Sequence, residues 1–270
     1  MARTLMYKGI SSPIPFSVRE YIFQLIRYHG LPLWFMDKSN LEKQLLGLSQ
    51  QINLRDLALV AEADVKGRIC NDKAELEDRV SLFREMASNY SCLYEPFPFE
   101  NGLTRFTYFS KHDSSPDYIP YDDTQFEVVL LSGLPGAGKD SWIQIYAHNV
   151  PVISLDSIRV ELKIKPTDNQ GRVIQLAKER ARVHLRKKQP FVWNATNLSQ
   201  QRRQALVQLF NTYKARIKIV YLEVPHSVLI ERNRKRKDSL PLTVLNRFID
   251  RMEIPQLSEA HKVEYYLDST

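Results

Sequence analysis

A glycine-rich stretch, LSGLPGAGKDSW over residues 131–142, holds the residues whose types and spacing point most directly to chemistry. Up to its lysine it follows the pattern G-x-x-x-x-G-K-[ST], in which backbone N–H groups and the lysine bind phosphate oxygens. The apolar run FEVVLLS precedes it, and a helix predicted directly after it would add partial positive charge at its N-terminus. In preference to a tight turn with a solvated lysine, we predict a nucleotide site made of Gly133, Gly136, Ala137, Gly138 and Lys139.

The residue after the lysine departs from that pattern, because Asp140 replaces the usual serine or threonine and Ser141 follows one position late. Mg²⁺ prefers hard oxygen ligands, and a carboxylate supplies one as well as a hydroxyl does. We therefore predict that Asp140 is a ligand of the Mg²⁺ that accompanies ATP, and that Ser141 contributes to nucleotide binding.

Polar side chains also follow the next two predicted strands. Asp156 comes at the end of VPVISLD, where it is expected either to accept the proton of an attacking hydroxyl or to cap the next helix. Arg159 lies three residues later and can face the same cleft, while Thr196 and Asn197 end the strand FVWNATN. Ligands of such sheets collect at this edge, so we predict that Arg159, Thr196 and Asn197 contact the acceptor.

The whole chain has a formal net charge of +7, and its basic residues are concentrated in the second half. Arg232 and Arg236 lie four residues apart in RNRKRK, on one face of a predicted helix, and could close over the phosphates as a lid. A basic surface suits a polyanionic partner, although a charge run alone is more often a solvated helix face. The members of the two runs are Arg180, Arg182, Arg186, Lys187 and Lys188, then Arg232, Arg234, Lys235, Arg236 and Lys237.

The elements that must position these residues divide the chain into three parts. Residues 126–270 alternate between apolar strands and helices, which predicts an α/β domain with a parallel sheet covered by helices on both faces. Residues 93–125 combine proline, serine, aspartate and Asn101-Gly102, and are predicted to be turns and a linker. Five strands are expected at 126–133, 150–156, 191–197, 216–224 and 262–267, with helices from about 139, at 170–188, after 199, at 226–237 and at 241–253.

Residues 1–92 are predicted to be helical only. Capping patterns open helices at Ser17, Ser39, Asn53 and Asp72. Apolar residues follow each cap at helical spacing, which predicts a bundle in which these stripes are buried. The stripe expected in the first of these helices is Val18, Ile22, Leu25 and Ile26.

The motifs of the second half, taken in order, resemble the polynucleotide 5′-kinase family over residues 126–254. The residues that carry the resemblance are GLPGAGKDSW, LDSIR, NATNLSQQRR, VPHSVLIERNRKRKDSLP and VLNRF. The resemblance implies that Lys139 binds the β- and γ-phosphates and that Asp156 is the general base. It also implies that Arg159 contacts the acceptor, and that Arg236 and Arg232 are lid arginines. It further implies ATP and Mg²⁺ as cofactors, a 5′-OH end of RNA or DNA as partner, and a role in end-healing or repair. The chain departs from the family at Asp140 and at Ala195, where an acid is expected before Thr-Asn.

In the first half, RYHG and LALVAEADVKGR resemble the later part of an HD-type metal phosphohydrolase domain, as in the helical domains of tRNA nucleotidyltransferases. The resemblance implies His29 and Asp64 as remnant metal-site residues, expected to be buried on facing helices, although a hydrogen-bonded core pair is the favoured interpretation. The family's His-Asp doublet is missing, because His112-Asp113 comes after both motifs. We therefore expect a truncated HD-like domain over 1–92, in which the metal site is incomplete.

Composition excludes several classes of protein. The chain has no apolar run of about 18 residues, so neither a membrane span nor membrane association is expected. It also lacks a secretory signal, and two cysteines are too few for a disulfide framework, which makes the cytoplasm the expected compartment. The leading hypothesis is an ATP-dependent kinase of polynucleotide 5′-hydroxyls. A small-molecule kinase and a catalytically silent, nucleotide-gated RNA-binding module remain the alternatives, and the oligomeric state stays open.

Overall fold

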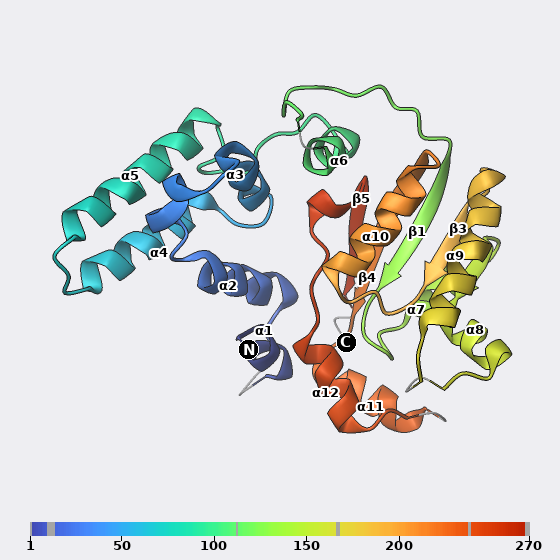
Figure 1. Ribbon diagram of the computed structural model, residues 1–270. Helices are drawn as coiled ribbons and strands as arrows, with labels where there is room; N and C mark the ends of the chain where they lie inside the picture. The colour runs from blue at the N-terminus through green and yellow to red at the C-terminus, as the bar shows by residue number, and fades with distance from the viewer. Residues whose placement is uncertain (1, 10–13, 112, 166–167, 237–238, 268–270) are drawn as a thin grey trace. The chain divides into compact units, whose positions relative to one another are not determined.

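The computed structural model describes residues 2–9, 14–111, 113–165, 168–236 and 239–267. The chain divides into two compact units, Met1–Ile119 and Pro120–Thr270, each of which is considered by itself (Figure 1). His112 of the His-Asp pair in the predicted linker lies outside the described residues. Among the described residues, no helix combines the length and apolar character needed to cross a bilayer.

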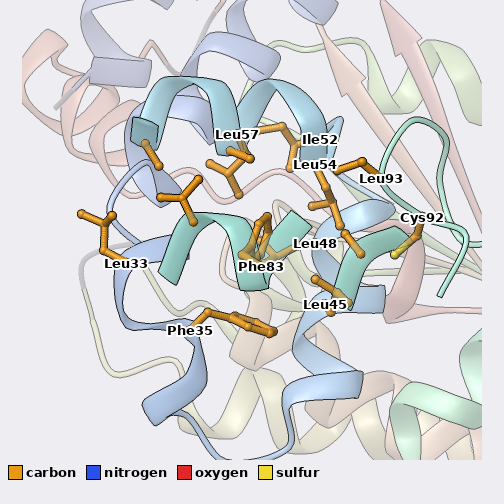
Figure 2. Packing of buried hydrophobic residues seen from close by; sticks show 14 of the residues in the cluster. Leu33, Phe35, Leu45, Leu48, Ile52, Leu54, Leu57, Phe83, Cys92 and Leu93 are labelled. Atoms are coloured by element: carbon orange, nitrogen blue, oxygen red, sulfur yellow. The ribbon is translucent and has the colours of Figure 1, made fainter. Parts of the chain in front are cut away.

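The first unit is built from helices, as the sequence predicts. Their bounds are α1 Ala2–Lys8, α2 Phe16–Tyr28, the 3₁₀ helix η1 Pro32–Asp37, α3 Leu41–Ser49, α4 Leu54–Gly67, α5 Lys73–Asn89 and α6 Gly102–Ser110. Its core forms where α4, α5 and η1 meet, and Figure 2 shows Phe83 of α5 among the leucines of α3 and α4. The Phe83 ring meets the ring of Phe35 edge-on, with 5.2 Å between centroids.

The predicted caps differ in how well they describe the helix starts. Asn53 does cap α4, since its side chain accepts hydrogen bonds from the backbone N–H groups of Arg55 and Asp56. Ser17 is not a cap, because α2 begins one residue earlier, after Pro15. Nor does Ser39 cap α3, which instead follows Asn40 in the left-handed region at φ 54°.

The apolar stripe predicted to be buried in α2 is largely exposed, with Val18, Ile22 and Ile26 all open to solvent. The buried residues of this helix include Arg19, whose guanidinium donates to Glu20 at 2.9 Å and lies 5.2 Å from the ring centroid of Tyr7 in α1. Because α1 contributes the covering aromatic side chain, α2 buries the side that carries Arg19.

Helix α6 lies within the stretch that was predicted to be turns and linker. Asn101, interpreted as part of an Asn-Gly turn, accepts a hydrogen bond from the Thr104 N–H and so caps α6. The hydroxyl of Tyr108 then donates to the Glu42 carboxylate of α3 at 2.7 Å. These contacts with α3 make residues 102–110 part of the helical unit.

The second unit has the predicted α/β architecture. Its strands are β1 Phe126–Ser132, β2 Val152–Ser154, β3 Phe191–Asn194, β4 Ala215–Glu223 and β5 Lys262–Leu267. Its helices are α7 Lys139–Tyr146, α8 Leu155–Leu162, α9 Gly171–Arg186, α10 Gln200–Asn211, α11 His226–Lys235 and α12 Leu242–Asp250, with a 3₁₀ turn η2 at Leu257–Glu259. Among the described residues the strands form one parallel sheet in the order β2-β3-β1-β4-β5.

Helices cover both faces of this sheet. On one face, Trp142 of α7 packs with Val192 of β3 and Val220 of β4. On the other, Phe191 of β3 meets His184 of α9 and Phe210 of α10. Consecutive residues of β3 therefore point to opposite faces, which places Asn194 on the same face as Val192 and α7.

Candidate active site

The glycine loop connects β1 to α7, as the sequence predicts, and backbone geometry explains two of its glycines. Gly138 stands at the N-cap of α7 with φ 97°, a conformation that strains residues with a side chain. Gly133 has φ 151°, and a Cβ built on it would lie 2.5 Å from the Leu222 carbonyl oxygen of β4. A larger residue at Gly133 would therefore push the loop away from the sheet.

The residues that follow β3 hold the start of this loop through hydrogen bonds. The Gly133 N–H donates to the Thr196 carbonyl oxygen at 2.9 Å, and the Ser132 hydroxyl donates to the Asn197 carbonyl oxygen at 3.1 Å. The Asn197 side chain is buried and donates to the Leu131 carbonyl oxygen at 2.6 Å. The Asn197 amide thus supports β1 and the loop, and its contact with the acceptor stays a prediction. Thr196 is partly exposed.

Lys139 lies over the loop, where its Nζ donates to the carbonyl oxygens of Gly133 and Leu134, both at 2.9 Å. Burial lowers the pKa of its ammonium group from 10.5 to about 8. The negative charges of Asp140 and Asp156 oppose this lowering, and the positive charge of Arg236 adds to it. Three other predicted site residues, Asp140 of α7, Asp156 of α8 and Arg236 at the end of α11, are thus within electrostatic reach of Lys139.

Asp140, in the first turn of α7, is exposed, and its Oδ1 accepts a hydrogen bond from Asn194 Nδ2 at 2.8 Å. Asn194 is not among the residues predicted from the sequence, where Ala195 is the position at which the polynucleotide 5′-kinase family leads one to expect an acid. The residue facing the loop is instead the last residue of β3, which lies beside β1 in the sheet. The sequence does hold a signal for Asn194: side chains alternate between faces along a strand, so Asn194 shares the face of Val192, whereas Ala195 follows the end of β3. Ser141 is exposed in the same turn.

The donor set suits a Mg²⁺ ion that arrives with a nucleotide. Among the described residues no group of three or more His, Cys, Asp and Glu side chains could hold a metal ion by itself. Asp140 offers a hard carboxylate oxygen beside Lys139, and Mg²⁺ is commonly held by one or two carboxylates together with substrate phosphates. Asp140 is therefore the residue that would hold such an ion.

Asp156 lies in the first turn of α8, and its carboxylate pairs with the guanidinium of Arg159 one turn later. Its alternative role as a helix cap is taken by Ser154, whose hydroxyl accepts a hydrogen bond from the Ser157 N–H. Arg159 in turn donates from Nε to Gln170 Oε1 at 2.7 Å. The Asp156 side chain is 85% exposed, so its carboxylate is accessible to an acceptor hydroxyl.

The two predicted lid arginines both lie near the loop. Arg232 of α11 packs against it, because a Cβ built on Gly138 would lie 3.6 Å from Arg232 Nη1. Arg236 is the exposed C-cap of the same helix, and Lys237 lies outside the described residues. Buried Asn233 exchanges hydrogen bonds with both backbone groups of Leu240, at 2.8 and 3.0 Å, which holds Leu240 beside α11.

His29 and Asp64 are not placed as a buried pair. His29 is exposed at the C-cap of α2, where its Nδ1 bonds the Ile26 carbonyl oxygen of its own helix at 2.8 Å. Asp64 pairs with Arg68 on the following turn of α4 and is 32% exposed. The predicted burial of both residues is therefore wrong. Each continues the helical spacing of an apolar stripe, but lies at the edge of the buried side.

Comparison with known proteins addresses the second unit. A family model described as an AAA domain matches residues 128–255. This match, the glycine loop and the strand order agree with the fold class predicted from the sequence. The second unit has a parallel α/β fold with a glycine-rich, phosphate-type loop between β1 and α7.

Solved structures with similar folds include a presumed kinase from Chloroflexus aurantiacus J-10-fl, with a TM-score of 0.46 and 16% sequence identity. That match covers 54% of this chain and 86% of the other. A gluconokinase from Sinorhizobium meliloti 1021 has a TM-score of 0.41 and 21% identity, covering 54% of this chain and 85% of the other. No curated protein matches the chain. Similarities at this level do not indicate a substrate.

Proposed function

We propose that the second unit transfers the γ-phosphoryl group of ATP, bound with Mg²⁺, to an alcohol, and that this alcohol is the 5′-hydroxyl of RNA or DNA. One observation carries the transfer reaction: the accessible Asp156 carboxylate and Arg236 lie within electrostatic reach of Lys139 in a phosphate-type loop. Phosphoryl transfer depends on such positioning and charge stabilisation more than on covalent chemistry by the protein.

The proposed step balances as an in-line displacement. The Asp156 carboxylate accepts the proton of the acceptor hydroxyl while that oxygen bonds to the γ-phosphorus. The bond between the γ-phosphorus and the β–γ bridging oxygen breaks, and ADP leaves. Lys139, Arg232 and Arg236 stabilise the negative charge on the phosphoryl oxygens, and Mg²⁺ supplies further charge neutralisation.

The acceptor assignment rests on charge near Arg159. Gln170, which holds Arg159, also donates to the Lys165 carbonyl oxygen at 2.9 Å, so that the segment between α8 and α9 is tied to the acceptor side. This segment carries Lys163 and Lys165, and α9 adds Arg172 in its first turn; all three are exposed, and the one acid of residues 163–172 is Asp168. The phosphates that follow the 5′-hydroxyl in a nucleic acid would be attracted by these cations, whereas a small neutral alcohol has no charge for them to attract.

A transfer assay with labelled γ-phosphate of ATP compares a 5′-OH oligonucleotide with small sugars and polyols at equal concentration. We expect label on the oligonucleotide, a steep loss of acceptor affinity with added salt, and a loss of at least about 100-fold in rate for Asp156→Asn. Label on a small alcohol alone would contradict the acceptor assignment and identify a small-molecule kinase. Nucleotide binding without transfer to any acceptor would contradict the proposed enzymatic activity and favour the catalytically silent, nucleotide-gated RNA-binding module.

A further inference from the structure

Asp140 and Asn194 occupy two positions that matter together in P-loop phosphotransferases. In such proteins, the metal ion is held by a serine or threonine hydroxyl of the loop and by an aspartate of a nearby strand. This chain has a carboxylate on the loop side, at Asp140, and an amide at the end of β3, at Asn194. The pair therefore still contains one carboxylate and one neutral polar group, with the positions exchanged.

The hydrogen bond between them shows that the two side chains form one unit. Asn194 is buried with 9% exposure, and its Nδ2 donates to Asp140 Oδ1 at 2.8 Å. The side chain of Asn194 lies on the α7 face of the sheet, and the register of β3 is fixed on both sides, by β1 and by β2. An amide held so firmly restricts the rotation of the exposed carboxylate.

The geometry points to Asn194 as the positioning residue of a relocated metal site: its amide engages Asp140 Oδ1 and orients Oδ2 toward the metal ion of the bound nucleotide. The inference rests on the proposed function only in that the ligand is a metal–nucleotide complex, and it does not depend on the acceptor. It also explains why an aspartate is tolerated after Lys139. A second carboxylate at the end of β3 would lie in contact with the first, and like charges repel.

The exchange can be tested by reversing it in the full-length protein. Four proteins are compared: the natural chain, Asp140→Ser, Asn194→Asp, and the double variant Asp140→Ser/Asn194→Asp. The affinity of a non-hydrolysable ATP analogue is measured with Mg²⁺ and in EDTA. The dissociation constant in EDTA divided by that with Mg²⁺ gives the metal-dependent part of the affinity. Because this ratio requires no transfer, it distinguishes failure of the metal site from failure of the proposed reaction.

In each single variant we expect the ratio of the dissociation constants to fall by about 10- to 100-fold, the range typical for groups that support metal ligands. The double variant restores the usual arrangement of hydroxyl and strand carboxylate, and its ratio is expected to recover to within about threefold of the natural chain. Affinity in EDTA and the melting temperature provide the internal controls. Asn149→Asp, the same charge change at an exposed residue after α7, leaves the ratio unchanged.

Two results would overturn the inference. One is a double variant whose loss equals the product of the two single losses, because independent sites behave in this way. The other is an unchanged metal dependence in Asp140→Ser. If Asn194→Asp fails to fold, Asn194→Ala removes the amide without adding charge, and it is expected to lose about tenfold of the metal-dependent part while keeping its affinity in EDTA.

Discussion

At the scale of single residues, the surroundings of Lys139 alter its acid–base chemistry. Its ammonium is buried against two loop carbonyl oxygens, and burial lowers its pKa to about 8. A bound triphosphate would supply negative charge at this place and raise the pKa again. Proton uptake at Lys139 is therefore linked to nucleotide binding.

This linkage predicts a pH dependence of nucleotide affinity. Below pH 8 the lysine is charged before and after binding, so its contribution is constant. Above pH 8 the free protein has lost the proton, and binding must recover it, so affinity falls by up to about tenfold per pH unit. Titration of the ATP analogue between pH 7.5 and 9.5 measures the slope.

Lys139→Arg is the matched variant, because arginine keeps its charge over this range. Its affinity is expected to be lower but independent of pH between 7.5 and 9.5. A natural protein without a slope above pH 8 would contradict the account of Lys139.

Sequence patterns were sufficient to place Lys139 at the start of the helix after the glycine loop, and Asp156 and Arg159 just after a strand; the roles of these residues stay predictions. The patterns were insufficient for Asn194 and Gln170, since an amide has no typical role until its partner is known. Both partners depend on contacts between separate elements: Asn194 bonds a residue 54 positions away, and Gln170 one 11 positions away.

At the scale of elements, a buried ion pair secures the segment that follows β3. Arg203 of α10 is fully buried and donates to both carboxylate oxygens of Glu259 in η2, at 2.7 and 2.9 Å. It also donates to the carbonyl oxygens of Asn197 and Glu253. Because Asn197 supports the glycine loop, this pair stabilises the loop indirectly.

Removing one charge of this pair is expected to be costly. Glu259→Gln leaves the Arg203 guanidinium buried without a charged partner, and should lower the free energy of unfolding of the second unit by about 3–5 kcal/mol. Glu161→Gln, the same change in a surface pair with Arg180, should leave stability unchanged within error. Denaturant titration measures both variants, and equal stabilities would contradict the importance of the buried pair.

The predicted elements show where local patterns are sufficient. Strand and helix alternation over 126–270 was correct because parallel strands are apolar on both faces and therefore conspicuous. Helix α6 was missed because Asn101-Gly102 suits both a turn and a capped helix start, and only the packing of Tyr108 decides between them. In α2, the apolar residues predicted the wrong buried side, since Arg19 packs against Tyr7 of α1 and Phe16 in the first turn of α2.

At the scale of the whole molecule, the chain has two units with separate hydrophobic cores. Phe83 is fully buried in the first. Phe83→Ala is expected to lower the free energy of unfolding of the helical unit by about 3–5 kcal/mol, through lost contacts and a cavity. Hydrogen exchange should increase in α4 and α5 but remain unchanged in β1, with unchanged nucleotide affinity.

Leu82→Ala, at an exposed position of the same helix, provides the control and should leave exchange in both units unaltered. Faster exchange in β1 of the Phe83→Ala protein, or a weakened nucleotide affinity, would show that the two cores do not behave as separate units.

The central claim, that the second unit is a phosphotransferase built around Lys139, is tested most directly by one measurement. Labelled γ-phosphate of ATP is followed in the presence of Mg²⁺ and paired oligonucleotides that carry either a 5′-hydroxyl or a 5′-phosphate. The account predicts label only on the 5′-hydroxyl oligonucleotide, and none with the Lys139→Met protein. Equal labelling by the Lys139→Met protein, or no label on any alcohol acceptor while ATP remains bound, would contradict it.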